Sequence, residues 1–257
     1  MIKGKASVKR ALPWAVTLIG VMGLLAGVPV PVTAQSNSAS PSQQQESADE
    51  LLQLGIEQLR QYNLKEAEKT FQRVLALRQQ QKDVPGQAAA LNHLGEVYNE
   101  LSENTKALEV LQQALAIYQQ LNNRQELGEV LDNLGEAYQG LNEYPKALES
   151  LQQALTIRRE IKDRNGEGET LNNIGVVYIS QGQFPQAGET LQQALAIRRE
   201  VKDSFSEPET IAWLGLANKG LGKTDQALEL LTQALQLSRQ VKNVRAEAGI
   251  LMITGLI

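Results

Sequence analysis

Cysteine is absent from this 257-residue chain, and histidine occurs once, as His93. The absence of cysteine excludes disulfides, thiolate metal sites, cysteine nucleophiles and a lipid-modified cysteine at a signal cleavage site. The sequence also lacks Gly-rich phosphate loops and Walker-type motifs, and no pair of acidic residues stands out as catalytic. We therefore expect a protein that is not an enzyme and has no catalytic residues, no metal and no cofactor.

Aromatic residues are scarce, at 4% of the chain, whereas 42% of it is hydrophobic. This composition supplies enough apolar material for a core, and abundant Ala, Leu and Gln favour helices. The net charge is −4, but residues 1–34 hold four basic residues and no acidic one. The remainder has 21 basic against 29 acidic residues, a formal charge of −8. An acidic body argues against a nucleic-acid partner.

Residues 1–34 have the pattern of an export signal. A basic segment at 3–10 precedes an apolar run without charge at 11–30, and small residues end at Ala34. This order predicts cleavage between Ala34 and Gln35. We expect a bacterial protein that is periplasmic or secreted.

Two alternatives for the same N-terminal segment remain open. The apolar run approaches the roughly 20 residues of a membrane span, so it could be an uncleaved anchor with the rest of the chain outside the cytoplasm. It could also be a buried helix. We expect contact with a membrane only through this segment. Residues 35–47, rich in Ser, Gln and Asn, read as a flexible linker.

A glycine recurs every 40 residues in the rest of the chain, within a Leu-Asn-Asn-Leu-Gly-like motif seen at 91–98, 131–138 and 171–178. The glycines are Gly55, Gly95, Gly135, Gly175, Gly215 and Gly255. Such a period is typical of repeat arrays, in which each unit buries its apolar face on its neighbours. A glycine in a helix costs about 1 kcal/mol relative to alanine, so its recurrence implies a close backbone contact.

Each unit is predicted to form two antiparallel helices. In the unit at 128–167, Leu131, Leu134 and Tyr138 share one face of the first helix, and a second apolar face follows a turn at 142–144. The spacing Leu134-Gly135-x2-Tyr138, followed by Ala147-x3-Leu151-x2-Ala154, resembles the tetratricopeptide (TPR) signature. HEAT and armadillo repeats have similar periods but lack this spacing.

The resemblance implies an all-α fold, a right-handed superhelical solenoid of antiparallel helix hairpins. It covers the TPR array at 48–257, as five full repeats and a half repeat. Their predicted boundaries are 48–87, 88–127, 128–167, 168–207, 208–247 and 248–257. The 40-residue unit is similar to the TPR arrays of kinesin light chains and of bacterial regulators. In that group the second Asn of the motif lines the concave groove and holds the backbone of a partner peptide, which here implies Asn133 and Asn173.

The helix pattern by itself also points to a groove. Since Leu131, Leu134 and Tyr138 take the packed face, the polar residues between them must point elsewhere. Amide side chains stacked across repeats offer donors and acceptors to an extended peptide backbone. The alternative is that they are solvated or hydrogen-bond neighbouring repeats. The candidate partner-binding residues are Asn92, His93, Glu96, Asp132, Asn133, Glu136, Asn172 and Asn173.

The sequence thus predicts a non-catalytic scaffold that binds a protein or an extended peptide. Two alternatives are a regulatory fragment of a larger enzyme, such as a caspase-like CHAT peptidase, and a structural or assembly scaffold. The half repeat at 248–257 has several large aliphatic residues and no second helix to cover them, so we expect an interrupted array or association with another chain there. These residues are Ile250, Leu251, Met252, Ile253, Leu256 and Ile257.

Overall fold

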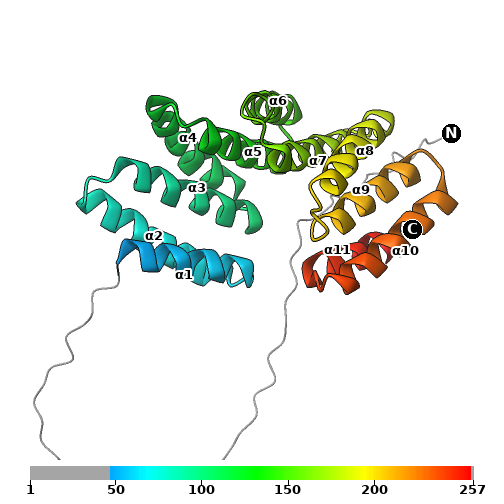
Figure 1. Ribbon diagram of the computed structural model, residues 1–257, viewed down its shortest axis with the longest axis horizontal. Coiled ribbons are helices and arrows are strands. Elements are labelled where there is room, and N and C mark those ends of the chain that lie inside the picture. Colours follow the sequence, from blue (N-terminus) through cyan, green and yellow to red (C-terminus); the bar gives the residue numbers. More distant parts are fainter. Residues whose placement is uncertain (1–46, 256–257) are drawn as a thin grey trace, which may run out of the picture. The chain divides into compact units, whose positions relative to one another are not determined.

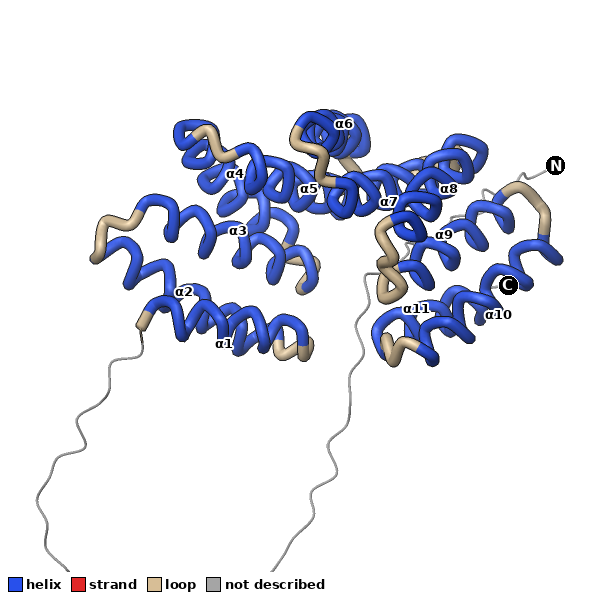
Figure 2. The backbone as a smooth tube through the Cα atoms, viewed as in Figure 1, coloured by secondary structure: helices blue, strands red, loops and turns tan. Residues whose placement is uncertain are grey.

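The computed structural model describes residues 47–255, and the part from 48 onward forms one compact unit. The predicted signal, its cleavage site between Ala34 and Gln35, and the linker up to residue 46 lie outside the described residues. The described part contains eleven helices and no strand (Figure 2). None of these helices is both long enough and apolar enough to cross a membrane. The prediction of an all-α fold is confirmed.

Ten of the helices form five consecutive hairpins, and the eleventh follows alone (Figure 1). The hairpins are α1 (Ala48–Arg60) with α2 (Leu64–Gln80), α3 (Val84–Glu100) with α4 (Asn104–Leu121), α5 (Arg124–Gly140) with α6 (Tyr144–Glu160), α7 (Arg164–Ser180) with α8 (Phe184–Glu200), and α9 (Glu207–Gly220) with α10 (Thr224–Gln240). The last helix is α11 (Val244–Gly255).

The odd-numbered helices form the inner layer of the array. Each of them contacts the next odd-numbered helix as well as its hairpin partner, so α3, α5 and α7 lie side by side. The even-numbered helices contact only the helices that precede and follow them in sequence. Because the odd helices approach one another more closely, the stack curves with their exposed sides facing inward (Figure 1).

Side-chain caps at the joints between hairpins mark where α3, α5, α7 and α11 begin. Asp163 accepts a hydrogen bond from the backbone N–H of Gly166, and Asn123 and Asn243 cap α5 and α11 in the same way. These caps satisfy N–H groups that have no partner inside the helix. The first helices therefore begin at 124, 164 and 244, four residues before the predicted boundaries at 128, 168 and 248.

In four of the five hairpins, the recurring glycine marks where a leucine from the second helix packs onto the first, and in the first hairpin Phe71 takes this place against Gly55. An ideal Cβ added to Gly135 would lie 2.5 Å from Cγ of Leu151, and one added to Gly175 would lie 2.5 Å from Cγ of Leu191. Both leucines are fully buried. The close contact is therefore between a side chain and the glycine backbone, rather than between two backbones.

The last helix presents two kinds of aliphatic residue. Ile250 and Ile253 are buried, whereas Leu251 and Met252 are each 48% exposed. Leu256 and Ile257 lie outside the described residues. The predicted association through this end of the array stays a prediction.

Replacing Gly135 with alanine tests the packing contact. The added methyl group collides with Leu151, so we expect Gly135→Ala to lower the free energy of unfolding by about 1–3 kcal/mol, although alanine favours helices. Gly188 in α8 is the matched control, because a Cβ there meets no heavy atom within 4 Å. Gly188→Ala should raise stability by up to about 1 kcal/mol. Urea unfolding followed by far-ultraviolet circular dichroism measures both, and equal stabilisation by the two changes would contradict the contact.

Candidate functional site

Three of the eight predicted groove residues lie buried between repeats. Asn92, Asp132 and Asn172 are 2%, 4% and 4% exposed. Asn92 Nδ2 donates to Oε1 of Glu129 over 2.8 Å, and Asn172 Oδ1 accepts from the hydroxyl of Thr210 over 3.0 Å. Buried polar groups of this kind are normally paired within the protein. For Asn92 and Asn172 the structure supports the inter-repeat alternative, whereas Asp132 pairs with Arg158 of its own hairpin. Because all three are buried, a partner cannot reach them.

The next row on the inner face consists of His93, Asn133 and Asn173, all partly exposed. Asn133 Nδ2 donates to Oδ1 of Asn92 over 2.9 Å, and Asn173 Nδ2 donates to Oε1 of Glu136 over 3.3 Å. The side-chain oxygens of both asparagines accept no hydrogen bond from within residues 47–255. Each therefore keeps an acceptor for a backbone N–H of a partner, and their assignment to partner binding stays a prediction.

His93 is enclosed on one side by an aromatic ring and on the other by acidic groups. Its ring stacks on Phe71 with centroids 5.0 Å apart, and its Nδ1 lies 3.4 Å from Oε2 of Glu96. Burial lowers the pKa of His93, but the hydrogen bond to Glu96 and the charges of Glu129 and Glu126 outweigh it and raise the pKa overall. Among the described residues, no group of three His, Cys, Asp or Glu side chains could hold a metal.

Two further acidic residues belong to this surface and were missed by the sequence analysis. Glu129 and Glu169 lie one helical turn before Asn133 and Asn173, on the same sides of α5 and α7. The recurrence of Glu at 129, 169 and 209 was a readable signal, since these positions are 40 residues apart. These positions lie two residues before the start of each eight-residue motif, so the motif does not include them.

The side chains of Glu136 and Glu169 are exposed at the surface, but the curved inner face surrounds them with protein and reduces the water around their carboxyl groups. This desolvation, with the charges of Glu100, Glu169 and Glu96, raises the pKa of Glu136 to about 8. Desolvation is also the main cause that raises the pKa of Glu129 and of Glu169. Desolvation and neighbouring like charges both favour the protonated form of a carboxyl group.

An open pocket of about 330 Å³ lies where α5 meets the α6–α7 joint. Arg158, which is buried in its wall, contacts Oδ2 of Asp132 over 3.2 Å and Oδ2 of Asp163 over 2.6 Å. The pocket thus combines the predicted groove residues Glu96 and Asn133 with groups that the motif did not indicate. Its lining consists of Glu96, Gln125, Glu129, Asn133, Arg158, Asp163, Asn165, Gly166 and Glu169.

One contact joins α11 to the opposite part of the array. Arg245 forms an ion pair with Glu100 of α3 and lies over the ring of Tyr62, at 5.4 Å from its centroid. The hydroxyl of Tyr62 also donates to Oε2 of Glu100 over 2.7 Å. Glu100 is therefore balanced by a cation, unlike the glutamates at the centre of the inner face.

The raised pKa values predict an unusual dependence of stability on pH. Between about pH 4.5 and pH 8 the native chain binds more protons than the unfolded chain at Glu136, so stability falls as pH rises through this window. The raised pKa values of Glu129 and Glu169 act in the same direction. The raised pKa of His93 acts in the same direction.

We expect a higher melting temperature at about pH 5 than at about pH 8, measured by circular dichroism. Glu136→Gln should reduce the difference, whereas Glu149→Gln, at an exposed position on α6, should leave it unchanged. A melting temperature that rises with pH, or an equal effect of both variants, would show that the inner carboxylates are not enclosed as described.

The array resembles several solved structures. It matches the crystal structure of Rap protein complexed with competence and sporulation factor, with a TM-score of 0.74 and 18% identity, over 79% of this chain and 57% of that one. The match to BtubC (BKLC) from P. vanneervenii has a TM-score of 0.62 and 20% identity, over 76% and 80% of the two chains. The match to the nearly identical TPR-like repeats of a putative kinesin light chain from Podosopora anserina has a TM-score of 0.57 and 21% identity, over 75% and 95%. At these identities the similarity shows the fold.

Among curated proteins, no sequence match reaches significance. The tetratricopeptide repeat family pattern, however, matches four overlapping segments of the chain: 47–120, 86–160, 126–200 and 166–240. The resemblance to TPR arrays predicted from the Leu-Gly-x2-Tyr spacing is thereby confirmed, and so is its similarity to the kinesin light chain type. Since the matches run from residue 47 to residue 240, the chain belongs to the tetratricopeptide repeat family.

Proposed function

We propose that this protein is a non-catalytic scaffold that binds an extended segment of a partner protein on its inner face. The observation that supports this most directly is the row formed by Asn133 and Asn173 on neighbouring inner helices. Each side chain is anchored by one internal hydrogen bond and keeps its amide oxygen as an acceptor. Anchored side chains bind with less loss of rotamer freedom than free ones.

The pocket beside this row supports the same function. Its lining residues come from α3, α5, α6 and α7, so a segment bound there would contact several repeats at once. A binding surface shared among repeats suits an extended chain, which presents its backbone N–H and C=O groups at regular intervals. The Rap structure, whose array is similar in fold, was solved in complex with the competence and sporulation factor.

The proposed function includes export, for which residues 1–34 are the support. We expect the exported chain to begin at Gln35, because a basic segment and an apolar run precede small residues that end at Ala34. Mass spectrometry of the protein recovered outside the cytoplasm measures its N-terminus. Recovery of the intact chain from the cytosol alone would contradict the export proposal without affecting the proposed groove.

Removing the two asparagines tests the groove. A peptide selected from a display library on the wild-type chain should bind the double variant Asn133→Ala, Asn173→Ala about 5- to 150-fold more weakly. This range corresponds to two hydrogen bonds of about 0.5–1.5 kcal/mol each. The melting temperature should also fall slightly, because both amides donate to neighbouring repeats.

The double variant Gln152→Ala, Gln192→Ala is the matched control. Both glutamines are exposed on the outer helices α6 and α8, so the change removes two amides far from the inner layer. It should bind the selected peptide as the wild-type chain does. Equal binding by all three proteins would place the binding surface elsewhere.

A further inference from the structure

We propose that the inner face is selective for cationic segments, that is, for an extended peptide rich in lysine or arginine. This inference rests on the proposed peptide-binding function and adds the chemical class of the partner. It follows from the balance of charges in the pocket, from the pairing of its one basic lining residue within the chain, and from the amide acceptors beside the pocket.

The pocket contains more acidic groups than the chain neutralises. Glu96, Glu129 and Glu169 line it, and the one basic lining residue, Arg158, is already shared between Asp132 and Asp163. Every lining residue except Gly166 carries a polar or charged side chain. An apolar segment would therefore gain little burial here, whereas a cationic one would meet complementary charge.

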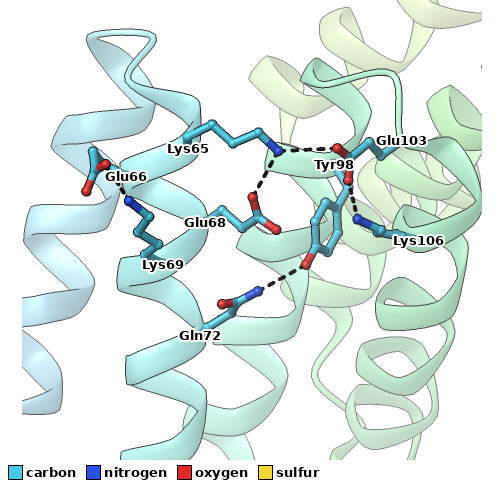
Figure 3. Close-up of polar contacts among 8 residues, drawn as sticks. All are labelled: Lys65, Glu66, Glu68, Lys69, Gln72, Tyr98, Glu103 and Lys106. Carbon is cyan, nitrogen blue, oxygen red and sulfur yellow. Dashed lines mark hydrogen bonds and ion pairs between the residues drawn. The ribbon is translucent and has the colours of Figure 1, made fainter.

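Elsewhere in the same array, some acidic side chains are paired with lysines. Figure 3 shows Lys65 between Glu68 and Glu103, at 3.2 and 3.3 Å, and Lys106 at 2.7 Å from Glu103. On the inner face, Glu129, Glu136 and Glu169 form no ion pair with Lys or Arg anywhere in residues 47–255. Glu96 forms an ion-pair contact only with His93. These inner carboxylates lie close together around one pocket without an ion pair to a lysine or arginine, so a cationic partner can neutralise several of them at once.

Asp132 contacts the pocket residue Arg158 from its buried side, over 3.2 Å, and is only 4% exposed, so a partner does not reach it. Its charge, together with that of Asp163, holds the Arg158 guanidinium. The basic lining residue is thus already engaged within the chain, and the charges of Glu96, Glu129 and Glu169 in the pocket remain for a cationic partner.

The geometry of the asparagine row also fits such a segment. The side-chain oxygens of Asn133 and Asn173 are acceptors, and they suit the backbone N–H groups of a bound peptide. The carboxylates of Glu129 and Glu169, one helical turn away, can pair with lysine or arginine side chains of the peptide. A peptide would thus be held through its backbone by the amides and selected through its charge by the glutamates.

Proton release is a signature of this binding mode. Desolvation raises the pKa of Glu129, Glu136 and Glu169 in the free chain. The cations Arg158 and Arg198 act against this at Glu169, and His93 acts against it at Glu129. The other charges within reach are those of Glu96, Glu100, Glu126, Asp132 and Asp163. A bound cation favours the ionised carboxylates and lowers their pKa. Binding should therefore release protons, and affinity should increase as pH rises from about 6 to about 8.

The test uses three fluorescent peptides of roughly ten residues, long enough to span about 33 Å when extended. They alternate serine with lysine, with glutamate or with asparagine, and binding to the purified full chain is measured by fluorescence anisotropy. The inner-face variant is Glu129→Gln with Glu169→Gln, in which the amide oxygen introduced at position 129 can still accept from Asn92. The control is Glu149→Gln with Glu189→Gln, at exposed positions on α6 and α8, which makes the same change in net charge.

We expect the lysine peptide to bind the wild-type chain and the control equally, with higher affinity at pH 8 than at pH 6, and the inner-face variant at least about tenfold more weakly. Equal binding of the lysine peptide by all three proteins would overturn the inference, because attraction would then be non-specific. Preferential binding of the asparagine or glutamate peptide would overturn the cationic class and leave the groove intact. Failure of all three peptides to bind the wild-type chain would overturn both the inference and the proposed peptide-binding function.

Discussion

The packing of a large apolar side chain onto a glycine backbone, Phe71 in the first hairpin and a leucine in the other four, is the contact on which the rest of the array depends. In the third hairpin, Leu151 of α6 occupies the space where a side chain at Gly135 of α5 would lie. This contact brings the two helices close together, and its repetition gives the hairpins a common shape. Hairpins of the same shape stack with the same rotation and translation from one repeat to the next, and this produces a regular solenoid.

Stacking also requires polar groups at the joints to be satisfied, and the chain uses a recurring arrangement for this purpose. Arg158 and Arg198 lie near the ends of their helices and pair with Asp163 and Asp203, five residues further on. Those aspartates in turn cap the first turn of the following segment. A buried ion pair by itself is weak evidence for stability. Here it joins the end of one hairpin to the start of the next, so it determines how successive repeats are oriented.

The curvature that follows from this stacking changes the chemistry of ordinary surface residues. Glutamates on an isolated helix would be fully solvated, and spaced carboxylates of this kind usually serve only solubility. On the inner face the neighbouring helices enclose them and bring Glu96, Glu136 and Glu169 within electrostatic reach of one another. The outer helices also carry charged residues, but on the convex side of the stack these residues lie further apart. Lysines such as Lys65 and Lys106 can therefore pair with a glutamate there (Figure 3).

The sequence by itself determined the repeat, the two helices of each unit and the special position of the glycine, because these depend on spacings within one hairpin. Only the tertiary structure separated Asp132, buried against Arg158, from Asn133, which is partly exposed and lines the pocket, although the two are adjacent in the chain. It also assigned Glu129 and Glu169 to the pocket. The helical period gives the direction of a side chain relative to its own helix. Which of those directions is covered depends on how the next repeat packs, and that is decided by contacts between residues in neighbouring repeats, such as Asn133 with Asn92 and Thr210 with Asn172.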